Sequence, residues 1–591
     1  MNYNLNFLAD IEEKKSTWQA LKNLLAFLKG EKNKLLVAIL VILLNSTLLL
    51  LGPLFTGYAV NNYIRTKDFH GLVLFSGFLL ITYLIALVTG YFQTKLMGSI
   101  SQRMLFSLRN GLFNKLLELP VSFFNQNKVG DLISRINNDT DKINQFFSQS
   151  LVQFVGGIAR MTGAGIFLLG IHFSLGAATL VPAVLIYIFT LFMSPWVKKV
   201  NAQNLKTAGG LSAEIQESLN NFKTIIAFNR RDYFRERFKQ ANFGNYSTAF
   251  KAGIANNLFM PVYGFFSTLA QMIVLVMGLS LIMSHSFSIG FLLSYLLYVN
   301  LFYDPLKQLA ALWSSFQVAM ASWDRISVIL NLKSDLSSTI DEKIIANNGM
   351  NSSPLMEFKD VSFSYTENQE ILHHINFTLE PGKKYALVGP TGGGKTTTAS
   401  LMARLYDAGK GKILLFGRDI RSYTTECLSE NIGFILQEPF LFTGTVGENI
   451  IYGNKIYESF TPEELLLKIE EAGLENILSS FEKGLNTPIS SGSENISLGQ
   501  KQLIAFMRAA LRRPKILILD EATANIDTIT EQLLEEILGN LPIETTQVII
   551  AHRLNTIENA DEIFFVNSGE VIPAGSFSGA LDLLMNKKRL S

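Results

Sequence analysis

Residues 384–398 read KYALVGPTGGGKTTT, an apolar strand-like segment that runs straight into a glycine-rich turn and a lysine. The turn matches G-x-x-x-x-G-K-[ST], whose glycines let backbone N–H groups close around phosphate oxygens at the positive end of a helix. Lys395 is predicted to neutralise the β- and γ-phosphates, and the Thr396 hydroxyl to bind Mg²⁺. A chance glycine-rich turn is the alternative, and the preceding strand argues against it. The predicted phosphate-site residues are Gly389, Pro390, Thr391, Gly392, Gly393, Gly394, Lys395, Thr396 and Thr397.

A second segment, residues 516–521 with the sequence ILILDE, predicts the other half of this site. Its four apolar residues are typical of a buried parallel strand, and ligands of open α/β sheets bind at the carboxyl ends of such strands. Asp520 is predicted to hold Mg²⁺ through water, while Glu521 orients and polarises the attacking water. The alternative is that the two carboxylates only cap the next helix, which the phosphate loop disfavours.

The composition is that of a membrane protein with a soluble part. The 591 residues are 48% hydrophobic, and the mean hydropathy is +0.25. The long apolar runs lie before about residue 325. A net charge of +2 gives no sign of nucleic-acid binding. The single cysteine, Cys427, excludes an intramolecular disulfide framework, and the histidines show no metal-ligand spacing.

Six apolar segments are long enough to cross a bilayer, which requires about 20 residues per helix. The predicted spans are residues 35–63, 72–96, 151–172, 175–196, 258–283 and 289–312. The external connections between them are short, whereas the internal ones, about 97–150 and 197–251, are long, charged and helical in pattern. The helices are therefore expected to continue far into the cytosol. An even number of spans places both termini on the same side, and the ATPase assigns that side to the cytosol.

Residues 1–33 carry mixed charge before any long apolar run and do not resemble a signal peptide. Residues 15–28 predict an amphipathic helix on the cytoplasmic surface, with an ordinary exposed helix as the alternative. The predicted domains are a transmembrane domain at 1–325, a linker at 326–354 and a nucleotide-binding domain at 355–591. The fold class is multi-domain: an all-α six-helix transmembrane domain with long cytosolic helix extensions, then an α/β P-loop domain.

The nucleotide domain resembles the ATP-binding cassette of ABC transporters. Six helices followed by one such domain is the half-transporter plan of ABC exporters, and residues 119–124 with 130–135 resemble the exporters' first intracellular loop. The resemblance implies ATP and Mg²⁺ as ligands. It assigns adenine stacking to Tyr365, with a half-buried strand aromatic as the alternative, and Mg²⁺ contact and signalling to Gln437. It also assigns γ-phosphate contact to His552 and the D-loop position to Asp527.

One motif departs from the family. The signature L-S-G-G-Q reads Ile496-Ser497-Leu498-Gly499-Gln500 here, and residues 489–493 also lack the family's acidic pattern. In the family this segment contacts the nucleotide held by the other subunit, so Ser497, Gly499 and Gln500 are the expected contacts. Leu498 adds a branched side chain near phosphate and disfavours positive φ. The departure favours a heterodimer with a related, non-identical half-transporter that has an intact signature; a homodimer that accommodates Leu498 is the alternative.

Polar residues within the spans are candidates for a substrate cavity, because they are costly in lipid. They are Asn45, Arg160, Gln271 and Asp304. Interhelical hydrogen bonds or ion pairs are at least as good an explanation of each. The chain is thus predicted to export an amphipathic or hydrophobic drug, lipid or peptide by ATP-driven alternating access. Its predicted location is a bacterial-type cytoplasmic membrane, in contact with membrane lipid. The alternatives are a homodimeric lipid flippase-type exporter and an ATP-gated channel or regulator.

Overall fold

A computed structural model describes most of the chain and divides it into two compact units. The described residues are 3–5, 22, 24, 29–332, 354–366, 369–490, 495–520, 528–550, 559–575 and 578–579. The helical unit comprises residues 6–116 and 130–331, and the sheet unit comprises residues 1–5, 117–129 and 332–591. Residues 117–129, predicted from sequence as part of the transmembrane domain, therefore group with the sheet unit.

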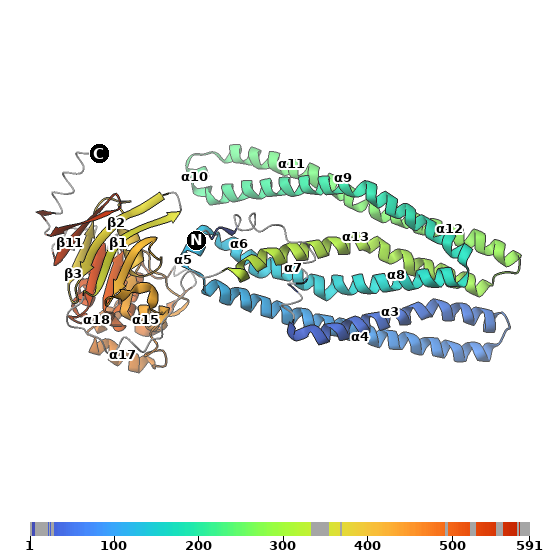
Figure 1. Cartoon of the computed structure of the whole chain (residues 1–591), viewed down its shortest axis with the longest axis horizontal. Coiled ribbons are helices and arrows are strands. Elements are labelled where there is room, and N and C mark those ends of the chain that lie inside the picture. The colour runs from blue at the N-terminus through green and yellow to red at the C-terminus, as the bar shows by residue number, and fades with distance from the viewer. Residues whose placement is uncertain are drawn as a thin grey trace. The chain divides into compact units, whose positions relative to one another are not determined.

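Long helices build the helical unit (Figure 1). They are α3 (Lys32–Ala59), α4 (Phe69–Leu117), α6 (Val129–Ser134), α7 (Thr140–Gln145), α8 (Leu151–Ile171), α9 (Phe173–Asn220), α10 (Phe222–Ala227), α11 (Arg231–Asn257), α12 (Phe259–Met283) and α13 (Ile289–Asn331), with π-helical turns at Val60–Ile64, Arg135–Asp139 and Phe146–Ser150. Within the described residues six helical stretches are long and apolar enough to cross a membrane, the number predicted from sequence. At 1.5 Å per residue the 48 residues of α9 span about 72 Å, far more than a bilayer core of about 30 Å. The helices thus continue well beyond the apolar spans, as predicted.

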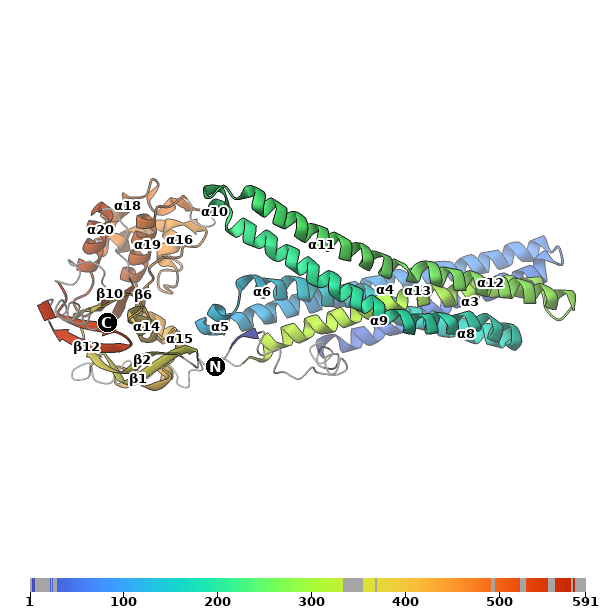
Figure 2. The same cartoon turned by 90° about the horizontal axis from the view of Figure 1, so that it is seen from above.

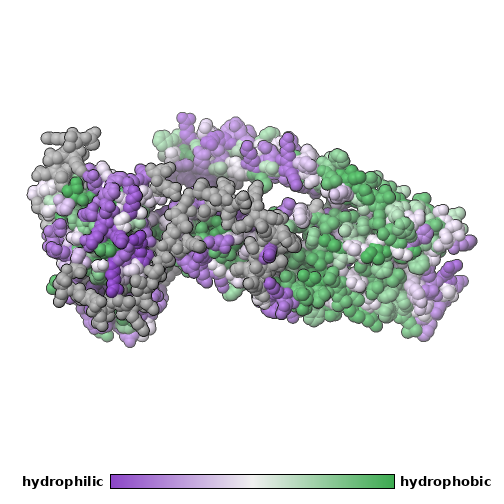
Figure 3. All heavy atoms as spheres, viewed as in Figure 1, coloured by the Kyte–Doolittle hydropathy of each residue, from purple (hydrophilic) through white to green (hydrophobic). Residues whose placement is uncertain are grey.

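The surface of the helical unit separates an apolar part from a polar part. Apolar side chains cover the part formed by α3, α8 and α12, whereas α11 is largely polar (Figure 3). Large side chains such as Phe69 and Met283 are 76% and 83% exposed. Such exposure is costly in water but not in lipid, so the apolar part matches a bilayer.

Three buried tyrosines on α13 fasten the bundle. Tyr298 donates to the Leu50 carbonyl at 2.7 Å, and Tyr303 donates to the Thr179 carbonyl at 2.7 Å. Tyr295 donates to the carbonyls of α8 and its end, including that of His172 at 2.9 Å. Because every such hydroxyl must find a partner away from water, these bonds fix how α13 packs on α3, α8 and α9.

Helix α11 lies beside α9 in both views (Figures 1 and 2).

The predicted linker at 326–354 and the predicted amphipathic helix at 15–28 are only partly covered by the described residues. Helix α13 continues to Asn331, into the range 326–354 assigned to the linker, because the apolar residues Ile326, Val328 and Ile329 are buried. Residues 333–353 of that range lie outside the described residues. The predicted amphipathic helix at 15–28 also lies outside them, except for Lys22 and Leu24.

The sheet unit contains a mixed six-stranded sheet, in the order β12-β11-β3-β10-β9-β6, and an antiparallel four-stranded sheet, in the order β2-β1-β4-β5. Strands β11, β3, β10, β9 and β6 are parallel, and β12 is antiparallel to β11. The strands are β1 (Met356–Thr366), β2 (Gln369–Leu379), β3 (Lys384–Val388), β4 (Lys410–Leu415), β5 (Arg418–Asp419), β6 (Ile432–Ile435), β7 (Gly444–Thr445), β8 (Pro488–Ile489), β9 (Ile516–Asp520), β10 (Thr546–Ile550), β11 (Glu562–Asn567) and β12 (Glu570–Gly575). The helices are α5 (Val121–Gln126), α14 (Lys395–Met402), α15 (Thr425–Asn431), α16 (Val446–Ile451), α17 (Pro462–Glu471), α18 (Glu475–Leu478), α19 (Leu498–Leu511) and α20 (Thr528–Gly539).

The apolar run of β9 explains the layers of this unit. Ile516 and Ile518 enter the core shared with α14 and β1, whereas Leu517 and Leu519 enter the core shared with α19 and α20. Successive side chains of a strand point to opposite faces, so a strand that is apolar at every position is buried on both. Figure 2 shows the result: α14 and α15 lie between the parallel strands and β1–β2, and α16, α18, α19 and α20 lie on the other face.

Candidate functional site

The phosphate loop lies between β3 and α14. Pro390, Thr391 and Gly392 are exposed, while Gly393, Gly394 and Lys395 are buried. The Lys395 Nζ donates to the carbonyls of Gly389 at 2.9 Å and Pro390 at 3.0 Å, which holds its charge over the loop. The N-terminus of α14 adds the positive end of a helix dipole to this charge. The loop therefore has the chemistry of a polyphosphate site.

Glycine is required in this loop by the protein's own backbone. A Cβ on Gly389 would lie 2.0 Å from the Val566 carbonyl oxygen, and one on Gly393 would lie 2.6 Å from the same atom. Gly389 and Gly394 also adopt φ of +145° and +113°, which side chains rarely tolerate. The glycines thus let the loop close over the end of β11.

The two motifs predicted from sequence meet in space. The Thr396 hydroxyl donates to Asp520 Oδ1 at 3.2 Å, and Asp520 is buried at the end of β9. Strand β10 lies between β3 and β9, with Ile550 opposite both Leu387 and Asp520. A hydroxyl and a carboxylate beside a phosphate loop are the oxygen ligands that Mg²⁺ prefers, so this pair fits the ion.

Three predicted site residues lie outside the described residues: Glu521, Asp527 and His552. Glu521 directly follows Asp520, and β10 ends two residues before His552. Their roles stay predictions.

Tyr365 lies beside the phosphate loop at the end of β1. Its hydroxyl donates to Thr397 Oγ1 at 3.1 Å, and its side chain is 43% exposed. Edge-to-face contacts with Phe363 and Tyr406, at centroid distances of 4.9 and 5.1 Å, fix the ring. A fixed, part-exposed ring next to α14 is suited to stack on a base.

Tyr406 extends this cluster to α5, a connection that the sequence pattern did not reveal. Asn125 on α5 donates to the Tyr406 hydroxyl at 2.5 Å. Burial raises the pKa of Tyr406, so its hydroxyl stays protonated and neutral around pH 7. The segment predicted as the first intracellular loop therefore touches the ring that supports Tyr365.

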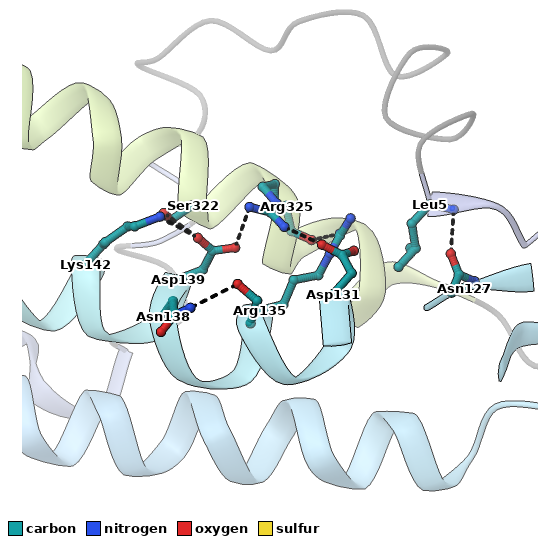
Figure 4. Close-up of polar contacts among 10 residues, drawn as sticks. Leu5, Asn127, Asp131, Arg135, Asn138, Asp139, Lys142, Ser322 and Arg325 are labelled. Atoms are coloured by element: carbon teal, nitrogen blue, oxygen red, sulfur yellow. Dashed lines mark hydrogen bonds and ion pairs between the residues drawn. The ribbon is translucent and has the colours of Figure 1, made fainter. Parts of the chain in front are cut away.

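The N-terminal residues lie on the same segment. The backbone N–H of Tyr3 donates to Gln126 Oε1 at 2.7 Å. That of Leu5 donates to Asn127 Oδ1 at 3.0 Å, as Figure 4 shows. The start of the chain thus braces the end of α5.

Gln437 follows β6, the strand next to β9, and is exposed. The segment after it is tied to α19 by Arg508, another residue that sequence reasoning missed. Arg508 donates to the Asn449 carbonyl at 2.8 Å and lies over the Tyr452 ring at 5.3 Å. A cavity of about 240 Å³ lies here, lined by Leu436 and Arg508 among others. The segment that follows Gln437 is thereby in contact with the helix that carries the signature.

The signature residues form the start of α19. Ser497 and Gln500 make a capping box, with Gln500 N to Ser497 Oγ at 3.2 Å and Ser497 N to Gln500 Oε1 at 3.0 Å. Gln500 also donates to the Ser480 carbonyl at 2.6 Å. No hydrogen bond of Ser497 or Gln500 reaches the phosphate loop within the part of the chain that the structure describes. The signature residues are thus not bonded to the phosphate loop of their own chain.

Leu498 is the first residue of α19 and does not adopt the positive φ that a leucine disfavours. This position therefore does not require glycine's conformational freedom. A helical φ is available to any L-residue. What remains is steric: the Leu498 side chain is 42% exposed.

A charged cluster in the helical unit joins the first intracellular segment to the end of α13 (Figure 4). Arg325 pairs with Asp131 at 2.7 Å and with the buried Asp139 at 3.2 Å. Asp139 also accepts from Lys142 and from Ser322, each at 3.1 Å. Asp139 and Ser322 are buried, whereas Arg325, Asp131 and Lys142 are part-exposed. The buried carboxylate needs its partners, so these contacts hold the two segments in one register.

The four candidate cavity residues differ in their surroundings: two form hydrogen bonds to a neighbouring helix, and two line a cavity. Asn45 donates to the Ala86 carbonyl at 2.6 Å, and Gln271 donates to Asn300 at 2.7 Å. Arg160 and Asp304 instead line a common cavity between α8 and α13. The structure therefore brings only Arg160 and Asp304 together.

Comparisons with known proteins agree with this geometry. The family described as ABC transporter transmembrane region matches residues 35–306, and that described as ABC transporter matches residues 372–524. The uncharacterized ABC transporter ATP-binding protein YfiC of Bacillus subtilis is 34% identical over 95% of this chain and 92% of its own length. This chain belongs to the ABC transporter family.

Further relatives have named substrates. The fatty acid ABC transporter ATP-binding/permease protein of Mycobacterium bovis is 31% identical, over 85% of this chain and 78% of its own. The ATP-dependent lipid A-core flippase of Mannheimia succiniciproducens is 30% identical, over 84% of each chain. With both family regions in one chain, this ABC transporter is an exporter-type half-transporter, a multi-pass membrane protein and an ATPase coupled to transport.

Proposed function

We propose that this half-transporter exports an amphipathic or hydrophobic substrate across the cytoplasmic membrane by alternating access. The observation that carries the proposal is the Thr396–Asp520 contact beside a glycine-lined phosphate loop, in a chain with six candidate spans. The relatives named for fatty acid and lipid A-core support an amphipathic substrate, since both compounds combine a polar group with apolar chains. The nucleotide domain and both termini face the cytosol.

In the nucleotide site each residue has one task. Lys395 neutralises the β- and γ-phosphates, and Tyr365 stacks on adenine. Thr396, Gln437 and Asp520 would hold Mg²⁺, and the ion would neutralise charge on the phosphates. Glu521 orients the attacking water and His552 contacts the γ-phosphate.

ATP binding favours a closed arrangement of two nucleotide domains, and hydrolysis resets it. The contact between Asn125 and Tyr406 supports α5 as the element that senses this change. Gln437 supplies a second route, through the Arg508 contacts to α19. Because nucleotide can shift the equilibrium only by its differential affinity, substrate and ATP affinities are coupled.

Half-transporters act as dimers, and the second subunit here is proposed to be a related but different chain. Ser497, Gly499 and Gln500 face the partner's nucleotide with the exposed Leu498 among them, which impairs that site by bulk. The partner's intact signature completes the site built on Lys395 and Asp520. Glu521 remains in this chain as the catalytic carboxylate.

Transport into inverted membrane vesicles tests the export proposal. ATP should drive uptake of a labelled amphiphile, and Glu521→Gln should abolish it while the protein still binds ATP. Gly539→Ala, whose new Cβ meets nothing within 4 Å, is the matched control. Ion currents that persist with bound ATP and no hydrolysis would instead indicate an ATP-gated channel.

The ATPase rate of the purified chain alone tests the heterodimer. We expect little activity without the second subunit. Full, substrate-stimulated hydrolysis by this chain alone would show that a homodimer accommodates Leu498.

A further inference from the structure

A polar cavity of about 240 Å³ lies between α8 and α13. Its polar lining comes from Gln153, Arg160, Asp304 and Gln308, and the rest is apolar. Arg160 lies eleven residues before the end of α8, about 16 Å along the helix, and Asp304 lies fifteen residues into α13, about 22 Å. In a bilayer core of about 30 Å both depths fall well inside the membrane.

The charge of Arg160 is not neutralised by the fold. Its side chain is half-buried, and no described residue forms a hydrogen bond or ion pair with its guanidinium. Asp304 lies near enough to act on the Arg160 charge, but its carboxylate pairs with Lys307 at 2.8 Å. Lys307 is not among the residues that line the cavity, so the lining carries one cation, Arg160, and one carboxylate whose charge is shared with Lys307.

The other polar groups of the spans show what a structural role looks like here. Asn45 and Gln271 each have close hydrogen-bond partners on a neighbouring helix. An interhelical bond is the expected state of a polar side chain within a bundle. Arg160 departs from that pattern, and an intramembrane ion without a structural partner indicates a functional site.

Size and donor chemistry restrict the ligand. A volume of about 240 Å³ is less than the roughly 300–1,000 Å³ of a drug-sized pocket. It suits a head group whose apolar tail lies outside the cavity. The guanidinium fork matches the paired oxygens of a carboxylate or a phosphate, and two side-chain amides, Gln153 and Gln308, can donate to the same oxygens.

We propose that this cavity binds the acidic head group of an amphiphilic substrate, with Arg160 as its main ligand. The proposal rests on the proposed export function and narrows the substrate class to anionic amphiphiles. A cationic amphiphile is disfavoured, because the one carboxylate of the cavity already pairs with Lys307.

Binding to the full-length protein in neutral-lipid nanodiscs tests the head-group preference. The probes share one alkyl chain and carry a carboxylate, a phosphate monoester, a trimethylammonium or a neutral glycerol head, at a pH where both acids are ionised. The wild type should bind one or both acids at least about tenfold more tightly than the neutral probe, as charge-assisted hydrogen bonds predict. The carboxylate and phosphate arms separate the two acid classes.

Variants locate the preference. Arg160→Gln should remove the preference for the acidic probes, and Arg160→Lys should keep part of that preference. Asp304→Asn should keep or increase the preference. Arg103→Gln makes the same change on α4, at an arginine that pairs with Glu31, and should leave it intact. Melting temperatures and ATP binding show that each variant is folded.

The outcomes are distinct. A trimethylammonium preference, or an acid preference that survives Arg160→Gln, would overturn the head-group assignment while ATP-driven uptake in vesicles remained. Failure of the export function would show as no ATP-dependent uptake of any probe by the wild type. A preference for the acidic probes that is lost in Arg160→Gln, reduced in Arg160→Lys and intact in Arg103→Gln supports the assignment.

Discussion

The phosphate loop and the signature turn both present the start of a helix, yet the chain constrains them very differently. In the loop, Cβ atoms on Gly389 or Gly393 would collide with the Val566 carbonyl. In the turn, Leu498 replaces the family's glycine and still takes an ordinary helical backbone. Its neighbour Gly499 is constrained, since a Cβ there would lie 2.9 Å from Thr530 Oγ1. Contacts within the chain thus require glycine in the loop and at position 499. At position 498 they do not, so the choice of residue there depends on what contacts its exposed side chain.

The largest effect should come from the loop. Gly393→Ala should lower ATP hydrolysis by roughly 100-fold or more. The loop must move away from the Val566 carbonyl, so its N–H groups no longer point at the phosphate oxygens. Steady-state phosphate release from the assembled dimer checks this, since the chain alone is expected to hydrolyse little ATP. Gly539→Ala, in open space at the end of α20, should keep wild-type activity. Equal activity in both variants would contradict the steric constraint.

Within the signature, Gly499→Leu should destabilise the protein by about 1–3 kcal/mol through overpacking against Thr530. Denaturant unfolding of the full-length protein in detergent measures the change. If Gly499→Leu unfolds at the wild-type midpoint, the turn is less constrained than its contacts indicate.

Loss of the capping box should have a smaller effect. Ser497→Ala removes the hydroxyl that accepts from Gln500 N, at a cost of about 1 kcal/mol. The same unfolding measurement applies, and Ser497→Asp, which can still cap α19, is the control. A larger loss in Ser497→Asp than in Ser497→Ala would argue against capping.

The smallest change in stability is expected at Leu498. Leu498→Ala should shift the free energy of unfolding by no more than about 0.5 kcal/mol, since the side chain is part-exposed and starts a helix. ATPase activity of the chain alone gives the second readout, and a rise there would show that the leucine obstructs a homodimeric site. A loss of stability above 1 kcal/mol would mean that Leu498 supports the fold.

The sequence alone was sufficient for features that local pattern encodes. The strand-loop-helix of residues 384–398 and the buried strand at 516–520 follow from glycine positions and an unbroken apolar run. The count of six spans follows from hydropathy and length. The family follows from several such motifs at consistent spacing.

Only the tertiary structure decided which side chains find partners. Arg160 and Gln271 are equivalent in sequence as polar residues within spans, but one lines a cavity and the other bonds to Asn300. The Asn125–Tyr406 bond joins residues 281 positions apart. Helical φ at Leu498 was likewise visible only in the folded chain. Pairing depends on where distant segments pack, and a single residue's chemistry gives its need for a partner but not the partner itself.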